Sequence, residues 1–327
     1  MTGLVGSTIL KVLNEYDFPI EELYLFASGN SKGKEIFYKE KGYFVKVLEL
    51  NSFENMDFVF MCSGSIVSKF WALVAEKAGC IVIDNSSYFR MEEDVALIVP
   101  EVNFDIFSLE RKLIANPNCS TIQAVICLNA LKSFGIRKVI YTTYQAVSGS
   151  GMKGINDLKG SLNGGEFTYY PYDISKTCIP QIDSFLDNGY TNEEMKMINE
   201  TRKILNIPNL DIVATCVRVP VMFSHGVSVV VEFENEIDID EIFVAFNRQE
   251  GLIIIDNIDK NIIPTGINST GNDKVYIGRI RKDLFNNKSI VFYCVADNIR
   301  KGAASNAVGI AMKIIEKSLS KGLAQEN

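Results

Sequence analysis

The chain has 327 residues, of which 47% are hydrophobic and 22% charged, so it has the length of two ordinary domains and the composition of a folded, water-soluble protein. Lys and Arg total 33 against 40 Asp and Glu, a net charge of −7 that argues against a general nucleic-acid-binding protein. No apolar run approaches the roughly 18 residues of a membrane span, and the first residues show no signal-peptide pattern. We expect a cytoplasmic protein without nucleic-acid or membrane partners.

Seven cysteines are spread along the chain, with no CxxC pair and an odd total. This pattern fits neither a disulfide framework nor a zinc site, so we expect reduced thiols and no bound metal. Cys62, Cys216 and Cys294 each end or interrupt an apolar, strand-like run, where cysteine packs as a small hydrophobic residue and stays inert.

The first third of the chain alternates short apolar runs with a helical pattern. We predict buried strands at Leu23–Ala27, Asp57–Cys62, Cys80–Asp84 and Leu113–Asn116, and a helix over Ile66–Ala78. Strands that alternate with helices are typical of βαβ units and a parallel sheet. The predicted fold class of this part is therefore α/β, with a parallel sheet of the doubly wound (Rossmann-type) kind.

Beyond Asn116 the strand-like runs become longer and the helices between them fewer, which predicts a second domain of the α+β class. The longest runs are Val139–Tyr144, Ile212–Val219, Val227–Phe233 and Ser289–Val295. The final stretch, Ala303–Leu319, has the periodicity of an amphipathic helix. We expect a first domain of residues 1–118 plus 299–327 and a second domain of residues 119–298.

The segment from Asn116 to Gln123 places Cys119 just ahead of an apolar helical run. Ser120 and Gln123 have the spacing of a capping box, so we expect Cys119 at the mouth of a helix N-terminus. There the helix dipole and the free backbone N–H groups favour a thiolate and can hold an oxyanion. The alternative is a cysteine that is simply buried at a helix start.

The only histidine of the chain is His225, which follows a strand end and Pro220, and we expect it on a loop. A single histidine is more often structural than catalytic, but this one comes seven residues after Arg218. Arg218 stands inside an otherwise apolar strand and needs a partner, because buried charges are rarely left unpaired. A bound carboxylate and an internal Asp or Glu are equally good candidates for that partner.

Three further segments are weaker evidence when each is taken alone. Thr2 to Gly6, before a helical run, looks like the second half of a glycine-rich dinucleotide loop. Asn85 to Arg90 follows a strand end, where ligands of open α/β sheets lie, and Gln145 to Gly151 supplies a side-chain amide beside a flexible turn. An ordinary loop is the alternative for each of them.

Together these segments resemble one family, aspartate-semialdehyde dehydrogenase, over almost the whole chain from Thr2 to about Ile315. The resemblance rests on the glycine loop, residues 84–87 with Arg90, residues 99–103, 116–123 and 143–149, the helix of residues 193–203, and residues 218–225. It implies NADP-dependent, phosphorylating oxidation of L-aspartate 4-semialdehyde to 4-aspartyl phosphate, which the cell runs reductively in lysine, threonine and methionine biosynthesis. It also implies a homodimer built through the second domain and a C-terminal helix on the cofactor domain.

The resemblance carries site residues over onto the matching positions. Cys119 is implied to be the nucleophile that forms a hemithioacetal and then a thioester, His225 the acid and base, and Gln145 the group that orients the reactants. Arg218 is implied to grip the substrate carboxylate and Glu193 to accept from the substrate ammonium group. The implied phosphate subsite consists of Arg90, Asn118 and Lys196. The implied cofactor-binding residues are Thr2, Gly3, Val5, Gly6, Ser28, Ser31 and Asn298.

The chain departs from the family's pattern at two places. Its adenosine pocket has Asn30 where the family commonly places an arginine, so we expect Ser28, Ser31 and Lys32 to meet the 2′-phosphate of NADP. A doubly wound domain also has a strand ahead of its glycine loop, whereas only Met1 precedes Thr2 here. We expect the natural start to lie upstream, because the flanking strands would otherwise present unpaired backbone groups to a buried gap.

Three alternative functions stay open. An N-acetylglutamyl-phosphate reductase shares the architecture and the thioester chemistry, but its acylated substrate amine gives Glu193 no ammonium group to bind. A hydrolase of the cysteine-protease kind could use Cys119 and His225, although the glycine loop would then have no purpose. A non-catalytic relative is the third alternative.

Overall fold

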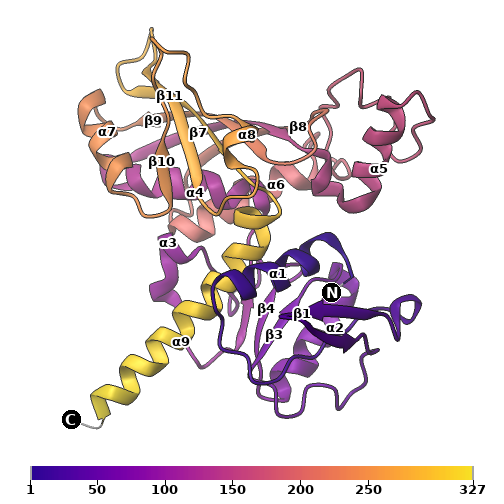
Figure 1. Ribbon diagram of the computed structural model, residues 1–327. Helices are drawn as coiled ribbons and strands as arrows, with labels where there is room; N and C mark the ends of the chain where they lie inside the picture. Colours follow the sequence, from indigo (N-terminus) through magenta and orange to yellow (C-terminus); the bar gives the residue numbers. More distant parts are fainter. Residues whose placement is uncertain (1, 326–327) are drawn as a thin grey trace. The chain divides into compact units, whose positions relative to one another are not determined.

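The computed structural model describes residues 2–325 and contains two separately packed units (Figure 1). The first unit runs up to Pro100 and adds Phe104–Asn116 and the chain from Ala303 onward. The second unit comprises Glu101–Asn103 and Pro117–Gly302. Among the described helices, none combines the length and the apolarity needed to cross a membrane.

The first unit is built on a four-stranded parallel sheet with the strand order β3-β4-β6-β5. Its strands are β3 (Phe58–Met61), β4 (Ile81–Asp84), β5 (Ala96–Leu97) and β6 (Leu113–Ala115). Helix α2 (Ser65–Lys77) connects β3 to β4, which confirms the predicted βαβ unit. The central strands are short apolar runs because a parallel sheet is covered on both faces.

Two long helices share the core of the first unit. They are α1 (Leu4–Glu15), which follows the glycine turn, and the predicted C-terminal helix α9 (Ser305–Gln325), which follows a π-helical segment at Arg300–Ala304. Small residues of α9, among them Ala307 and Ala311, lie in one buried cluster with Ile9 and Val12 of α1. Alanine at these positions lets the two helix backbones approach closely.

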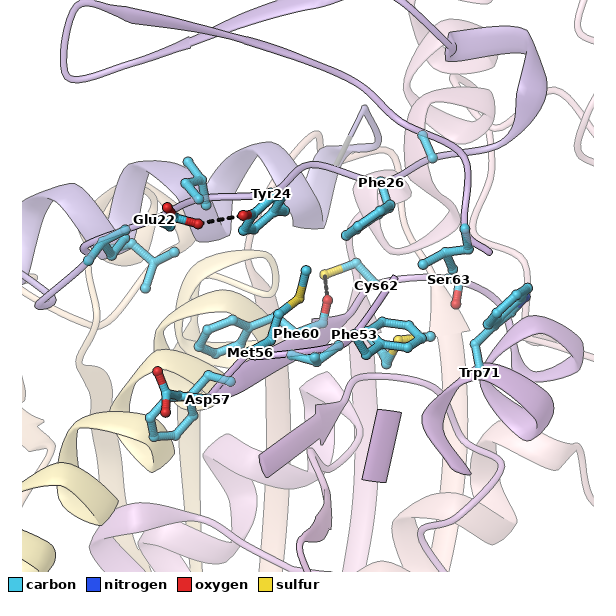
Figure 2. A pocket seen from close by; sticks show the side chains of 18 of the residues that line it. Glu22, Tyr24, Phe26, Phe53, Met56, Asp57, Phe60, Cys62, Ser63 and Trp71 are labelled. Carbon is cyan, nitrogen blue, oxygen red and sulfur yellow. Dashed lines mark hydrogen bonds between the residues drawn. The ribbon is translucent and has the colours of Figure 1, made fainter. Parts of the chain in front are cut away.

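The prediction of a strand at Leu23–Ala27 is wrong, because only Phe26 forms a bridge, parallel to Lys46. A strand needs a continuous ladder, and on its other side this segment faces a cavity instead of β3 (Figure 2). A separate antiparallel hairpin, β1 (Glu35–Tyr38) and β2 (Lys41–Phe44), follows it. The remaining helical segments of this part are the 3₁₀ turns at Gly29–Ser31 and Phe104–Ile106. Of the short helix α3 (Pro100–Asn103), only Pro100 belongs to this unit.

The second unit is a mixed six-stranded sheet with the order β10-β11-β12-β9-β7-β8. The four long predicted runs are confirmed as β7 (Ile136–Gln145), β8 (Asp211–Arg218), β9 (His225–Phe233) and β12 (Ser289–Ala296). The sequence patterns do not predict the other two strands, β10 (Leu252–Ile254) and β11 (Val275–Lys282). Buried and exposed residues alternate along β7 and β8, as expected when one face of a sheet packs on a core.

Helix α4 (Cys119–Leu131) packs against this sheet and against α6 (Asn192–Leu205) and α7 (Ile239–Arg248). Because it is covered on all sides, α4 is apolar around its whole circumference, with ten of its residues buried from Ser120 to Leu131. The other helices of the unit are α5 (Gly151–Leu162), α8 (Gly266–Ser269) and the 3₁₀ turns at Lys132–Phe134 and Val147–Ser150.

Candidate active site

Three polar side chains meet at one edge of the sheet in the second unit. Gln145 ends β7 and Arg218 ends β8, and the two residues are paired directly because these strands are parallel and in register. Strand β9 runs antiparallel to β7 and begins with His225. The strand ends therefore carry an amide, a guanidinium and an imidazole to the same edge.

Cys119 is the first residue of α4, and Asn118 is the N-cap of this helix. The Asn118 side-chain oxygen accepts hydrogen bonds from the backbone N–H groups of Ser120, at 2.9 Å, and Thr121, at 3.2 Å. The predicted place of Cys119 at a helix N-terminus is confirmed, but the predicted capping box of Ser120 and Gln123 is wrong. Asparagine is a strong N-cap, and its position starts the helix two residues earlier than a Ser120 cap would.

Glu193 connects the helix start to the sheet edge. Its Oε1 accepts from Asn118 Nδ2 at 2.8 Å and from Gln145 Nε2 at 3.1 Å. Gln145 Nε2 also donates to the hydroxyl of Ser120. The amide oxygen of Gln145 is buried and accepts no hydrogen bond from the described residues, so it can still take a donor from a ligand.

The start of α6 fixes Glu193 and Lys196 on one helix face. Thr191 and Glu194 form a true capping box, with Thr191 N donating to Glu194 Oε2 at 2.7 Å. Lys196 Nζ donates to Glu193 Oε2 at 3.1 Å and to Asp183 Oδ2 at 2.8 Å. Burial on its own raises the pKa of Glu193, but the Lys196 cation and the amide donors outweigh it and lower the pKa to about 2. Glu193 is therefore a carboxylate at neutral pH.

His225 is buried, with 1% of its surface exposed, at the first residue of β9, so the prediction of a loop position is wrong. The ladder with β12 reaches this point, where His225 pairs with Ala296. Burial and the nearby Arg218 cation lower the pKa of His225 to about 3, so the ring is neutral. Its Nδ1 accepts from Ala146 N at 3.0 Å, which assigns the ring proton to Nε2.

Arg218 is 5% exposed, and its Nη1 donates to the carbonyl of Ala146 at 2.6 Å. No carboxylate of residues 2–325 forms a salt bridge with it, so the structure does not contain the internal acidic partner that was one of the two candidates. Gly149 lies against both groups: a Cβ there would stand 2.9 Å from Arg218 Nη1 and 3.2 Å from His225 Nε2. The guanidinium and the imidazole therefore converge on one small space.

Two residues of this site were missed from the sequence. A Cβ at Gly302 would lie 2.8 Å from Cys119 Cβ, so only glycine fits beside the thiol-bearing residue. Glu200, 1% exposed on α6, accepts from Asn118 N at 2.6 Å and so fixes the residue that precedes Cys119. The i, i+3, i+7 spacing from Glu193 through Lys196 to Glu200 was a signal for a shared helix face.

Asn298, a predicted cofactor residue, is buried just after β12, whose last residue Ala296 pairs with His225. Its Oδ1 accepts from Ser224 N at 2.9 Å and from the Ser148 hydroxyl at 3.1 Å. Both partners adjoin the catalytic candidates, since Ser224 precedes His225 in the chain. Asn298 therefore belongs to the same edge of the sheet.

The other predicted cofactor residues belong to the first unit. Gly3 is the N-cap of α1, and a Cβ at this position would meet open space. Gly6 is buried in the first turn of the helix, next to the half-buried Val5. The Thr2 hydroxyl accepts from Ser31 at 3.4 Å, and Ser28 caps the 3₁₀ turn that ends at Ser31. A helix start with open space before its N–H groups fits an anionic pyrophosphate, so these residues fit a dinucleotide.

Arg90 lies in the first unit, buried behind the ends of β4 and β6. Its Nε donates to the carbonyl of Asn116 at 2.9 Å and its Nη2 to the carbonyl of Asn85 at 3.0 Å. The guanidinium is thus oriented by backbone groups at the carboxyl edge of the parallel sheet, where ligands of such sheets bind.

Comparison with known families covers both units. A sequence profile described as semialdehyde dehydrogenase, NAD binding domain, matches residues 1–108. A second, described as semialdehyde dehydrogenase, dimerisation domain, matches residues 128–301.

Individual relatives match nearly the whole chain. The aspartate-semialdehyde dehydrogenase of Aquifex aeolicus (strain VF5) is 46% identical over 329 residues, which cover 97% of both chains. The crystal structure of aspartate semialdehyde dehydrogenase II from Vibrio cholerae is 42% identical, with a TM-score of 0.92 and 96% of each chain covered. A second structure of that enzyme, complexed with ASA, is 41% identical, with the same TM-score of 0.92 and 96% of each chain covered.

Proposed function

The chain belongs to the aspartate-semialdehyde dehydrogenase family, and from that premise we propose that it oxidises L-aspartate 4-semialdehyde to 4-aspartyl phosphate with NADP and phosphate, or runs the reverse reduction. It is an oxidoreductase with a nucleotide-binding domain and a dimerisation domain. The relative complexed with ASA supports this choice of substrate.

We assign the nucleophile to Cys119. Its thiolate adds to the aldehyde carbon to give a hemithioacetal, and after oxidation the same sulfur carries the acyl group as a thioester. An oxygen of phosphate then attacks the thioester carbonyl, the C–S bond breaks, and the thiolate returns as the acyl phosphate leaves. The position at the first turn of α4 favours the negative sulfur in each step.

One observation supports the substrate assignment most directly, namely the buried Arg218 guanidinium without a carboxylate partner in the described chain. A buried cation of this kind calls for an anion, and a guanidinium binds a carboxylate with two parallel hydrogen bonds. Glu193 supplies the opposite charge at the same sheet edge, through Gln145, for the substrate ammonium group. The pair suits an α-amino acid.

His225 and Gln145 act on the reacting atoms. The neutral ring of His225 holds its proton on Nε2, beside the space that Gly149 leaves open, and so it donates to the oxygen of the hemithioacetal. The proton stays on the ring: its hydrogen bond stabilises the negative oxygen that forms when the thiolate adds to the aldehyde, and the thioester forms when hydride leaves the same carbon. The free amide oxygen of Gln145 orients the reactants from the neighbouring strand end.

For phosphate we assign Lys196 and Asn118, which both contact Glu193 in the second unit. The lysine cation provides the positive charge that an oxyanion requires. The role of Arg90 in phosphate binding stays a prediction from the resemblance.

The residues of the first unit that would hold NADP are those of the glycine turn and the 3₁₀ turn, namely Thr2, Gly3, Val5, Gly6, Ser28 and Ser31. A cofactor role for Asn298 stays a prediction from the resemblance. When bound, NADP supplies hydride transfer. The N–H groups at the start of α1 bind the pyrophosphate, and the hydroxyls of Ser28 and Ser31 meet the 2′-phosphate. We further propose a cytoplasmic homodimer through the second domain, which rests on its match to a dimerisation domain.

The test is a spectrophotometric assay of NADPH formation from the semialdehyde and phosphate. Cys119→Ser should lose at least roughly three orders of magnitude in kcat, because a serine alkoxide is not available at neutral pH. Cys178→Ser is the matched control, since Cys178 is exposed, and it should keep the activity. Activity only with N-acetylglutamate semialdehyde, or a near-normal kcat of Cys119→Ser, would exclude the proposed reaction.

A further inference from the structure

The chain reverses its direction between β8 and β9 within the six residues 219–224. β7 lies between these two strands in the sheet, parallel to β8 and antiparallel to β9. The connection therefore crosses the end of β7 and turns back before β9 begins. Its last residue is Ser224, and the next residue, His225, carries the imidazole of the site.

Ser224 makes this reversal in a backbone conformation that L-residues rarely adopt. Its φ is +72°, in the left-handed region where the Cβ crowds the backbone. Nine non-glycine residues of the described chain have a positive φ, and Ser224 is the only one of them that is buried, with 3% of its surface exposed. A residue keeps such a conformation only when its surroundings fix it, and residues of this kind cluster at functional sites.

The backbone N–H of Ser224 is held by a side chain from the end of another strand. It donates to Asn298 Oδ1 at 2.9 Å, just beyond β12. The same amide group contacts the Ser148 hydroxyl, at 3.0 Å from Nδ2 and 3.1 Å from Oδ1. Ser148 follows two residues after Ala146, whose N–H donates to His225 Nδ1 at 3.0 Å. Asn298 thus connects the two backbone segments that determine where the imidazole lies.

The Ser224 hydroxyl belongs to a chain of hydrogen bonds at the end of α8. Ser269 Oγ donates to Ser224 Oγ at 2.9 Å, and Thr270 Oγ1 lies 2.8 Å from Ser224 Oγ. Thr270 Oγ1 in turn donates to the Gly266 carbonyl at 2.7 Å, whereas the contacts of Ser224 and Ser269 to this carbonyl are longer, at 3.3 Å each. Because a hydroxyl has one proton to donate, the shortest contacts leave Ser224 as the donor to Thr270.

The hydroxyl partners are themselves held in place. Ser269 is completely buried, and the N–H of Gly271, just after α8, donates to Asp297 Oδ2 at 2.8 Å. Asp297 directly precedes Asn298 in the chain. The backbone contact and the hydroxyl contacts of Ser224 therefore both lead back to the end of β12.

The imidazole has little freedom to tolerate a change in this turn. A Cβ at Gly149 would stand only 3.2 Å from His225 Nε2, so the ring already lies close to the backbone on that side. A return of Ser224 to a negative φ would redirect the chain at the residue that carries the ring. A group that donates to a reacting oxygen must lie within about 2.6–3.2 Å of it, so such a redirection would misplace the donor.

We propose that Ser224 is a positioning residue for His225. Its left-handed backbone sets the direction in which the imidazole enters the site, and the contacts with Asn298 and with the two hydroxyls at the end of α8 hold this backbone. The expected effect on the reaction rate rests on the proposed function, whereas the orientation of the ring does not.

Glycine and alanine at position 224 separate the backbone conformation from the hydroxyl. Both variants lack the Oγ, but only glycine adopts a positive φ without steric cost. Because His225 is the only histidine, ¹⁵N-labelled histidine gives one set of ring NMR signals, which are recorded without substrate. Ser224→Gly should keep the wild-type signals of the Nε2–H form at pH 7, and Ser224→Ala should show a mixture of both neutral tautomers. The kcat should fall on the order of 100-fold in Ser224→Ala and stay near the wild-type value in Ser224→Gly, with the KM for the semialdehyde unchanged in both.

A second pair of variants does not depend on whether Ser224→Ala folds. Thr270→Val keeps the shape of the side chain and removes the acceptor of the Ser224 hydroxyl, so it should lower kcat about tenfold, the equivalent of one hydrogen bond. In the Ser224→Gly background the same change should have no further effect, because the hydroxyl that it served is absent. The control is Val231→Ala in the buried part of β9, which should lower the thermal stability and leave kcat and the ring signals unchanged.

Equal kcat values and equal ring signals in Ser224→Gly and Ser224→Ala would overturn the proposal. A full effect of Thr270→Val in the Ser224→Gly background would overturn it as well, because Thr270 would then act through another group. The ring signals also keep this test separate from the proposed function. A wild-type chain that is inactive toward the semialdehyde would refute the proposed function, whereas ring signals that do not change in Ser224→Ala would refute the role of Ser224.

Discussion

Replacement of Gly302 by alanine tests whether the position of Cys119 depends on the empty space beside it. The added Cβ would stand 2.8 Å from Cys119 Cβ and 3.2 Å from Cys119 Cα, whereas carbon atoms prefer about 3.5–4.0 Å. The neighbours are backbone or first side-chain atoms, so no flexible chain end can move aside, and relief requires a shift of about 1 Å. A shift of that size at a reacting group costs on the order of 100-fold in rate.

We therefore expect Gly302→Ala to lower kcat about 100-fold while the chain still folds. The assay measures kcat together with the rate of Cys119 alkylation by iodoacetamide, which reports on the thiol without the full reaction. Gly309→Ala is the control: Gly309 lies in α9, and its added Cβ would lie 3.5 Å from Pro100 Cγ, an ordinary van der Waals contact. It should keep the activity and gain about 0.5–1 kcal/mol of stability. Unchanged kcat and alkylation in Gly302→Ala would refute the reasoning.

Three other predictions follow from the charges of the site. Arg218→Lys keeps the cation but loses the planar fork, so about 1.5–3 kcal/mol of hydrogen bonding to the substrate carboxylate should be lost. The KM for the semialdehyde should then rise roughly 10- to 150-fold while the KM for phosphate stays constant. Equal changes in both KM values would contradict the assignment. His225 is the only histidine, and burial with the nearby Arg218 lowers its pKa to about 3, so its ring NMR signals should show the neutral Nε2–H form throughout pH 8 to 5. A titration of the ring with a midpoint near pH 6.5 would disprove the buried, neutral state. The Glu193 pKa of about 2 lies below the ordinary glutamate value of 4.5, so the stabilising effect of this carboxylate is complete above pH 4.5 and is lost as the pH falls toward 2. Denaturant titrations should show a smaller loss of stability over this interval in Glu193→Gln.

The elements that the sequence predicted best are those whose signals are local. The runs that became β7, β8, β9 and β12 carry long apolar patterns, and the structure confirms all four. The pairing of Gln145 with Arg218, in contrast, depends on the register of two strands that are distant in the chain. No local pattern contains that register, so the meeting of these two residues followed only from the family resemblance.

Both errors at the site arose because a local sequence signal competed with another interaction and lost. Ser120 and Gln123 have the spacing of a capping box, yet Asn118 takes the cap because its oxygen reaches the N–H groups of both Ser120 and Thr121. The sequence predicts a loop at His225 because this residue follows a strand end and Pro220. The ladder with β12 nevertheless extends to this residue, since long-range pairing outweighs the local turn signal.

The charge state of Glu193 also bears on which substrate the site accepts. With a pKa of about 2, this carboxylate cannot take up a proton at neutral pH to accommodate an apolar neighbour. A substrate whose amine is acylated would place an uncharged acyl group against a buried anion, which loses solvation without gaining a cation. Under the proposed assignment, an amino acid with a free ammonium group would add a donor to Glu193, and its carboxylate would pair with Arg218. We therefore predict that the charge of Glu193 discriminates against acylated substrates without steric exclusion.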